Sequence, residues 1–180
     1  DRIKSYIDWK YAGLIIRPGK ETFINDLVGL DPLYLVDWSD DLLTPSLSNF
    51  NGEYQNRLRV YIESPTSTDV LSTMPNNQLG LCVAFNFFET TTIEVLEHYL
   101  ENIFKKLRPG GVLAMTFNDC DRAHGVALCE RSFMCYTPGS EIQKRAEKHG
   151  FAWIRHLRAL AVLNEKPRVG EPFAHQANSL

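Results

Sequence analysis

The chain has 180 residues, of which 44% are hydrophobic and 23% charged, and its formal net charge is −3 with a pI near 6.0. These values are typical of one globular domain with a hydrophobic core. They exclude attraction to nucleic acid or anionic lipid that is driven by the overall charge of the chain. No apolar run approaches the roughly 20 residues that span a bilayer, so we expect no membrane partner.

In chain order, the patterns predict a helical stripe at 2–11, a strand at 12–16, a helix at 22–28, strands at 33–36, 58–62 and 79–85, a helix with an apolar stripe from 93 to 107, a strand at 112–117, a helix that opens at 137–138, and closing strands at 151–157 and 158–163. Two polar segments interrupt this order. Residues 38–57 are rich in Asp, Ser, Asn and Pro, with Leu42, Leu43, Leu47 and Phe50 as expected anchors. Residues 118–136 are expected to form a polar loop with one or two helical turns.

The clearest helix is the one over 93–107, because its apolar residues recur at helical spacing. Thr91 and Glu94 match a capping box at its start, and Glu101 stands one turn before Lys105. The Pro-Gly-Gly run at 109–111 is predicted to end the helix and lead into the next strand.

Strands that alternate with helices at this spacing predict a three-layer, Rossmann-like α/β sandwich with a mainly parallel sheet. The last two strands have no helix between them, which predicts one antiparallel edge strand from the 151–163 region. We expect a single domain over residues 1–163 and an irregular tail over 164–180.

The four cysteines, Cys82, Cys120, Cys129 and Cys135, do not have the spacing of a disulfide framework. Reduced thiols of this kind favour an intracellular setting, and we expect a cytoplasmic protein. The Asp, Cys and His residues of the 118–136 segment match no closed zinc pattern, so no metal site is predicted. Because the chain begins at Asp1 without an initiator Met, we expect either a processed product or a piece of a longer polypeptide.

Four segments together resemble the class I S-adenosylmethionine-dependent methyltransferases. They are PLYLVDWSDDLL at 32–43, TDVLSTMPNNQLGLCVAFNFFE at 68–89, LEHYLENIFKKLRPGGVLAMTFND at 96–119 and YTPGSEIQKRAEKHGFAWI at 136–154. Their order and spacing carry the resemblance, which covers about residues 12–163. It implies S-adenosylmethionine as cofactor, S-adenosylhomocysteine as product, and a ligand site beyond the carboxyl ends of the strands.

The resemblance implies a cofactor site made of Arg17, Pro18, Gly19, Asp37, Trp38, Asp69, Val70, Phe85 and Asn86. Asp37 corresponds to the acid that accepts both hydrogen bonds of the ribose diol, and Trp38 could then cover the adenine. Asp69 aligns with an acid that binds the adenine amino group, and Asn86 stands where the family contacts cofactor or acceptor.

Each of these assignments has a structural alternative. Asp37 could simply end a strand, Trp38 could be a partly buried surface aromatic, Asp69 could cap a turn, and Asn86 could serve loop hydrogen bonding.

The segment after the first strand departs from the family. Family members have an acid and several glycines there, whereas this chain has Arg17, Pro18, Gly19 and Lys20. Pro18 removes a backbone donor and only one glycine remains. The two cations could hold the cofactor carboxylate or an anionic acceptor, or they could be solvated loop charges.

Two functions follow from this mixture. The first is an S-adenosylmethionine-dependent methyltransferase whose acceptor (small molecule, protein or nucleic acid) and catalytic residues the sequence does not identify. The second is a catalytically inactive, methyltransferase-like binding or structural module, part of a larger protein or assembly. A methyltransferase requires an open pocket that continues from Asp37 past Gly19 to Asn86, with Arg17 and Lys20 pointing into it.

Overall fold

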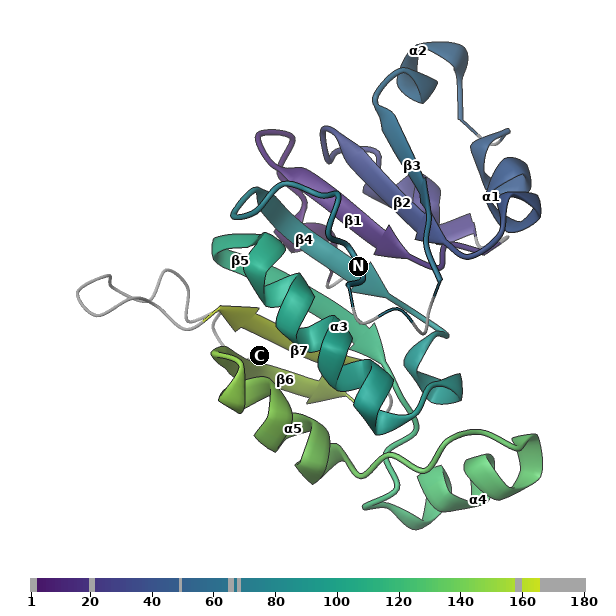
Figure 1. Ribbon diagram of the computed structural model, residues 1–180, viewed down its shortest axis with the longest axis vertical. Coiled ribbons are helices and arrows are strands. Elements are labelled where there is room, and N and C mark those ends of the chain that lie inside the picture. The colour runs from purple at the N-terminus through teal and green to yellow at the C-terminus, as the bar shows by residue number, and fades with distance from the viewer. Residues whose placement is uncertain are drawn as a thin grey trace.

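The computed structural model describes residues 3–19, 22–48, 50–64, 67, 69–157 and 160–165. One seven-stranded sheet forms the centre of the molecule (Figure 1). Its strands are β1 Ala12–Ile16, β2 Leu33–Asp37, β3 Leu58–Ile62, β4 Leu79–Ala84, β5 Leu107–Thr116, β6 Phe151–Leu157 and β7 Leu160–Glu165. All seven predicted strands are therefore present, with shifts of a few residues at their ends.

The strand order is β3-β2-β1-β4-β5-β7-β6. The first five strands are parallel, as the alternation of strands and helices in the sequence predicts. The chain leaves β3 at one edge and re-enters at β4 beside β1, so the strand order reverses between β1 and β4. Ligands of open α/β sheets bind at such a reversal, outside the carboxyl ends of the strands.

The sheet has one antiparallel strand, but the prediction that it lies at the edge is wrong. β7 lies between β5 and β6 and runs antiparallel to both, so β6 forms the edge (Figure 1). Only residues 158 and 159 separate β6 from β7, and so short a connection forces the two strands to pair antiparallel. β7 continues to Glu165, two residues into the predicted tail, and residues 166–180 lie outside the described part of the chain.

Two hydrophobic clusters cover the two faces of the sheet. On one face, α3 Ile93–Lys106 and α5 Gly139–Lys148 contribute Leu96, Leu100, Ile103 and Ile142, which are fully buried. On the other face, the 3₁₀ helix η2 Thr22–Leu27 and α1 Asp40–Leu47 contribute Ile24, Leu27 and Leu43. The molecule is therefore a three-layer, Rossmann-like sandwich.

The helices differ from the prediction at several places. The stripe at 2–11 forms only a 3₁₀ turn, η1 Lys4–Tyr6, because the chain becomes extended at Ile7 before it enters β1. The segment 38–57 contains α1 and α2 Gly52–Gln55, and the 118–136 loop contains a full helix, α4 Ala123–Ser132.

The ends of α3 also differ. Its N-cap is Thr92 rather than the predicted Thr91. The Thr91 hydroxyl instead donates to the carbonyl of Phe88, in the 3₁₀ turn η3 Phe88–Thr90. At the other end the Pro-Gly-Gly run lies inside β5, where Gly110 has a φ of 76° and the pairing register with β4 shifts. The predicted pair between Glu101 and Lys105 is present at 2.8 Å.

Among the described residues, none of the helices has the length and apolarity that a bilayer crossing requires.

Candidate functional site

Polar groups gather where β1 and β2 end. Asp37 is the last residue of β2, and Arg17 follows the last residue of β1. The Arg17 backbone N–H donates to the Val36 carbonyl at 2.7 Å, so the ladder between the strands continues one residue past β1. Arg17 has a φ of 54°, a left-handed conformation that costs a non-glycine residue about 1–2 kcal/mol and is enriched at ligand sites.

The Asp37 carboxylate is buried and only half satisfied. Asp37 is 3% exposed, and its Oδ1 accepts a hydrogen bond from the Trp38 backbone N–H at 2.8 Å. Oδ2 is also buried and has no hydrogen-bond partner among the described residues. Burial raises the pKa of Asp37, while the Trp38 hydrogen bond and the charge of Arg17 act against that rise. An ionised oxygen in this position requires a hydrogen-bond donor beyond the described residues.

Trp38 lies beside this carboxylate and is 36% exposed. The guanidinium carbon of Arg17 stands 4.0 Å from the centroid of the indole ring, which is a close cation–π contact. The ring also lies tilted against Phe87, at 6.3 Å between centroids. Arg17 therefore occupies one face of the Trp38 indole ring.

A small pocket opens at this point, with about 190 Å³ of empty space. It is lined by Ile16, Arg17, Val36, Asp37, Trp38, Glu63, Phe87 and Tyr99. This volume includes space open to solvent, and the enclosed part is far smaller than a ligand pocket, so a cofactor would need part of this wall to move.

Two residues that line the pocket with polar groups, Glu63 and Tyr99, were not predicted from the sequence. Glu63 follows β3, and its carboxylate accepts from the Leu71 backbone N–H at 2.6 Å and from the Thr73 hydroxyl at 3.4 Å, which orders the segment after the strand. Tyr99 is on the buried face of α3, and burial together with the charges of Glu63 and Asp37 raises its pKa. The strand-end rule that selected Asp37 would also have found Glu63, whereas Tyr99 could not be distinguished from a core residue.

The structure brings together only three of the nine predicted site residues, Arg17, Asp37 and Trp38. Pro18 is buried, and Gly19 has a φ of 57° with open space around its α-carbon, but neither lines the pocket. Lys20 lies outside the described residues.

The remaining predicted residues lie on other elements. Asn86 is exposed beyond β4, with a φ of 53°, and its backbone N–H donates to the Thr116 hydroxyl at 2.8 Å. Phe85 packs on the cluster that covers the opposite face of the sheet. Asp69 is exposed, whereas Val70 is 1% exposed and belongs to the core. The pocket thus includes Asp37 and Arg17, while Gly19 and Asn86 are not among its lining residues.

Asp119, in the polar segment after β5, has a structural position. Its carboxylate is buried and accepts from the backbone N–H of Gly139 at 3.0 Å, the first residue of α5, and from Arg122 Nε at 3.0 Å. In the described part of the chain, no group of three or more His, Cys, Asp and Glu residues is arranged to hold a metal ion.

No protein-family model and no curated protein matches this sequence, but many solved structures match its fold. A chain from the complex of the Haloferax volcanii Trm112 methyltransferase activator with a methyltransferase has a TM-score of 0.70 at 13% identity, over 90% of this chain and 85% of that one. An O-methyltransferase family protein from Burkholderia thailandensis has a TM-score of 0.70 at 12% identity, over 89% and 52%.

Haemonchus contortus phosphoethanolamine N-methyltransferase 2, solved with S-adenosyl-L-methionine, has a TM-score of 0.64 at 16% identity, over 83% of this chain and 35% of that one. This chain therefore spans about half or less of the last two proteins. The likeness establishes that the chain has the class I methyltransferase fold.

Proposed function

We propose that this chain binds S-adenosylmethionine where β1 and β2 end and transfers its methyl group to an acceptor. The observation that carries the proposal is the buried Asp37 carboxylate, whose Oδ2 has no donor among the described residues. The two hydroxyls of a ribose are adjacent donors, and hydrogen bonds to a charged acceptor contribute about 1.5–3 kcal/mol. A ribose at Asp37 would therefore satisfy the oxygen that has no partner among the described residues.

The fold and one neighbour support this assignment. Asp37 lies at the carboxyl end of β2, next to the strand-order reversal at which open α/β sheets bind ligands. The Haemonchus contortus enzyme of the same fold was solved with S-adenosyl-L-methionine. Trp38 offers an aromatic ring to the adenine, which requires the Arg17 guanidinium to move off that ring.

The cofactor, when bound, supplies an electrophilic methyl group on a sulfonium sulfur. The chain's own residues then bind and orient: Asp37 holds the ribose, and Arg17 pairs with the cofactor carboxylate once it has left Trp38. The buried rings of Phe87 and Tyr99 form the dry wall of the pocket. Methyl transfer needs mainly this alignment, so the site requires no acid–base pair.

The second candidate function is that of a binding or structural module with the same fold that catalyses no methyl transfer. The stack of Arg17 on Trp38 and the small pocket volume favour it, because together they cover the surface that an adenine would use. The single glycine of the first loop also limits how closely backbone donors can approach a ligand.

Calorimetric titration with S-adenosylmethionine and S-adenosylhomocysteine tests the proposal. We expect micromolar binding, which Asp37→Asn weakens by about 10-fold to 150-fold, the equivalent of one charged hydrogen-bond acceptor. Asp41→Asn, which changes an exposed acid on α1, should leave the affinity unchanged. Absence of heat at millimolar ligand would favour the inactive module.

Arg17→Ala separates the two candidates further. In an enzyme this change should weaken binding, because the cofactor carboxylate loses its cation. In a module that the guanidinium closes, the same change should create binding that the unmodified chain lacks.

A further inference from the structure

Two cysteines that the proposed methyltransferase site does not use lie side by side near α4. Cys120 follows β5 in the chain and Cys129 is on α4. Their Sγ atoms are 3.4 Å apart. The sulfur atoms of a disulfide are about 2.05 Å apart, so an approach of about 1.4 Å would close the bond.

Each thiol is held in place by its own contact. Cys120 Sγ lies 3.5 Å from the Asn118 carbonyl, and Cys129 Sγ lies 3.2 Å from the Cys135 carbonyl. The third cysteine of the region, Cys135, donates its backbone N–H to the Glu89 carbonyl at 3.0 Å. The contact between sulfur atoms thus joins Cys120 to Cys129, although Cys135 is closer in sequence to Cys129.

The two thiols differ in accessibility. Cys129 is 1% exposed, and burial together with the neighbouring Cys120 raises its pKa to about 11. Cys120 is only partly buried, so a dissolved oxidant reaches it first. Reactive cysteines are accessible thiols, whereas buried ones are inert until a partner becomes activated.

We propose that Cys120 and Cys129 are a reversible redox pair that hydrogen peroxide converts to a disulfide. The Cys120 thiolate attacks a peroxide oxygen, the O–O bond breaks, and a sulfenic acid and one water form. The Cys129 thiol then attacks the sulfenic sulfur, the S–S bond forms, and a second water leaves. Two thiols and one hydrogen peroxide thus give one disulfide and two waters.

The disulfide would fasten α4 to the carboxyl end of β5. In Figure 1, α4 lies beyond the arrowheads of β5 and β6, which are the carboxyl ends of these strands. In the reduced protein this helix is held by the ion pair between Arg122 and Asp119 and by close packing of Gly125 on the Asp119 carbonyl. The redox pair does not depend on the proposed methyl transfer.

Oxidation of the full chain with hydrogen peroxide tests the proposal. The number of free thiols, counted after unfolding, should fall from the four of the sequence to two, and dithiothreitol should restore them. Arg122 and Arg131 place the three cysteines of this region in separate tryptic peptides, so mass spectrometry identifies the linked pair directly. Cys82, which is fully buried in β4, should stay reduced.

Two variants and one condition serve as controls. Cys135→Ser should still lose two thiols, and Cys120→Ser should form no internal link. In concentrated urea the folded geometry is absent, so the linked peptides should include Cys135. Retention of all four thiols in the folded chain, or a native link between Cys129 and Cys135, would overturn the proposal.

Discussion

Asp37 is a residue at which local stability and the proposed function oppose each other. Burying an ionised carboxylate with one unpaired oxygen costs free energy, because water can no longer hydrogen-bond to it. Proteins retain such costs mainly at functional sites, where a ligand later satisfies the group. Arg17, held at a positive φ next to it, is a second local cost at the same place.

This opposition predicts that Asp37→Asn stabilises the fold at neutral pH, by about 1 kcal/mol, since a neutral amide loses less on burial than a carboxylate. The pKa of Asp37 is higher in the folded chain than in the unfolded chain, so protonation of Asp37 stabilises the fold. This stabilisation is complete below the unfolded pKa near 3.9, and it is lost as the pH rises through the folded pKa. Urea unfolding should therefore show the largest difference between variant and parent at neutral pH and almost none below pH 4.

Asp41→Asn is the matched control, and we expect it to change the free energy of unfolding by less than about 0.5 kcal/mol. A clear loss of stability in Asp37→Asn at neutral pH would mean that the carboxylate supports the fold, and the functional argument for Asp37 would then lose its basis.

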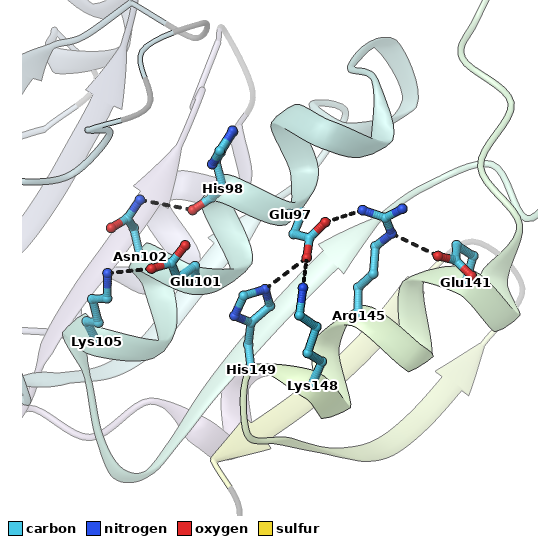
Figure 2. Close-up of polar contacts among 9 residues, drawn as sticks. All are labelled: Glu97, His98, Glu101, Asn102, Lys105, Glu141, Arg145, Lys148 and His149. Atoms are coloured by element: carbon cyan, nitrogen blue, oxygen red, sulfur yellow. Dashed lines mark hydrogen bonds and ion pairs between the residues drawn. The ribbon is translucent and has the colours of Figure 1, made fainter.

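Among the elements, α3 and α5 are joined by a charge cluster centred on Glu97 (Figure 2). Glu97, on α3, accepts from Arg145 and from Lys148 at 2.8 Å, and it lies 3.3 Å from His149 Nε2. Its side chain is only 23% exposed. The hydrogen bond from Lys148, followed by the charges of Arg145 and the contact with His149, lowers the pKa of Glu97 to about 2.

We expect Glu97→Gln to lower the free energy of unfolding by about 1–2 kcal/mol at pH 7, less than the full pKa shift because the group is partly solvated. A lowered folded pKa contributes stability that is present above about pH 4.5 and lost as pH falls toward 2, so the variant should lose less stability than the parent over that interval.

Urea unfolding at pH 7 and pH 3 measures both effects. Glu101→Gln is the matched control, because its partner Lys105 is on the same helix and both side chains are about half exposed. Equal effects of the two substitutions would show that the Glu97 cluster is an ordinary surface ion pair.

An element could be predicted from the sequence where its own apolar side chains pack against the core. The α3 stripe was predictable because Leu96, Leu100 and Ile103 all face the core. α4 buries only Gly125 and Cys129, so it has no apolar stripe and appeared to be a loop. β5 was predicted to begin at residue 112, whereas it begins at Leu107, because the Pro-Gly-Gly run that suggested a break lies inside the strand, where its pairing register with β4 shifts.

At the level of the whole molecule, the parallel sheet was predictable and its final order was not. Three of the five parallel strands, β1, β2 and β4, are buried along their whole length. The insertion of β7 between β5 and β6 depends on tertiary packing, which the local sequence pattern does not reveal. The site shows the same division. A carboxylate at a strand end was found from the sequence, but the contact of Arg17 with Trp38 depends on side-chain directions that spacing does not give.

The most direct test of the central claim is a crystal structure of the chain grown with S-adenosylhomocysteine. The account predicts the ribose hydroxyls within hydrogen-bond distance of Asp37 Oδ2, about 2.5–3.0 Å, and the Arg17 guanidinium displaced from Trp38. A structure at millimolar ligand in which Arg17 still stacks on Trp38 and no ribose contacts Asp37 would contradict it.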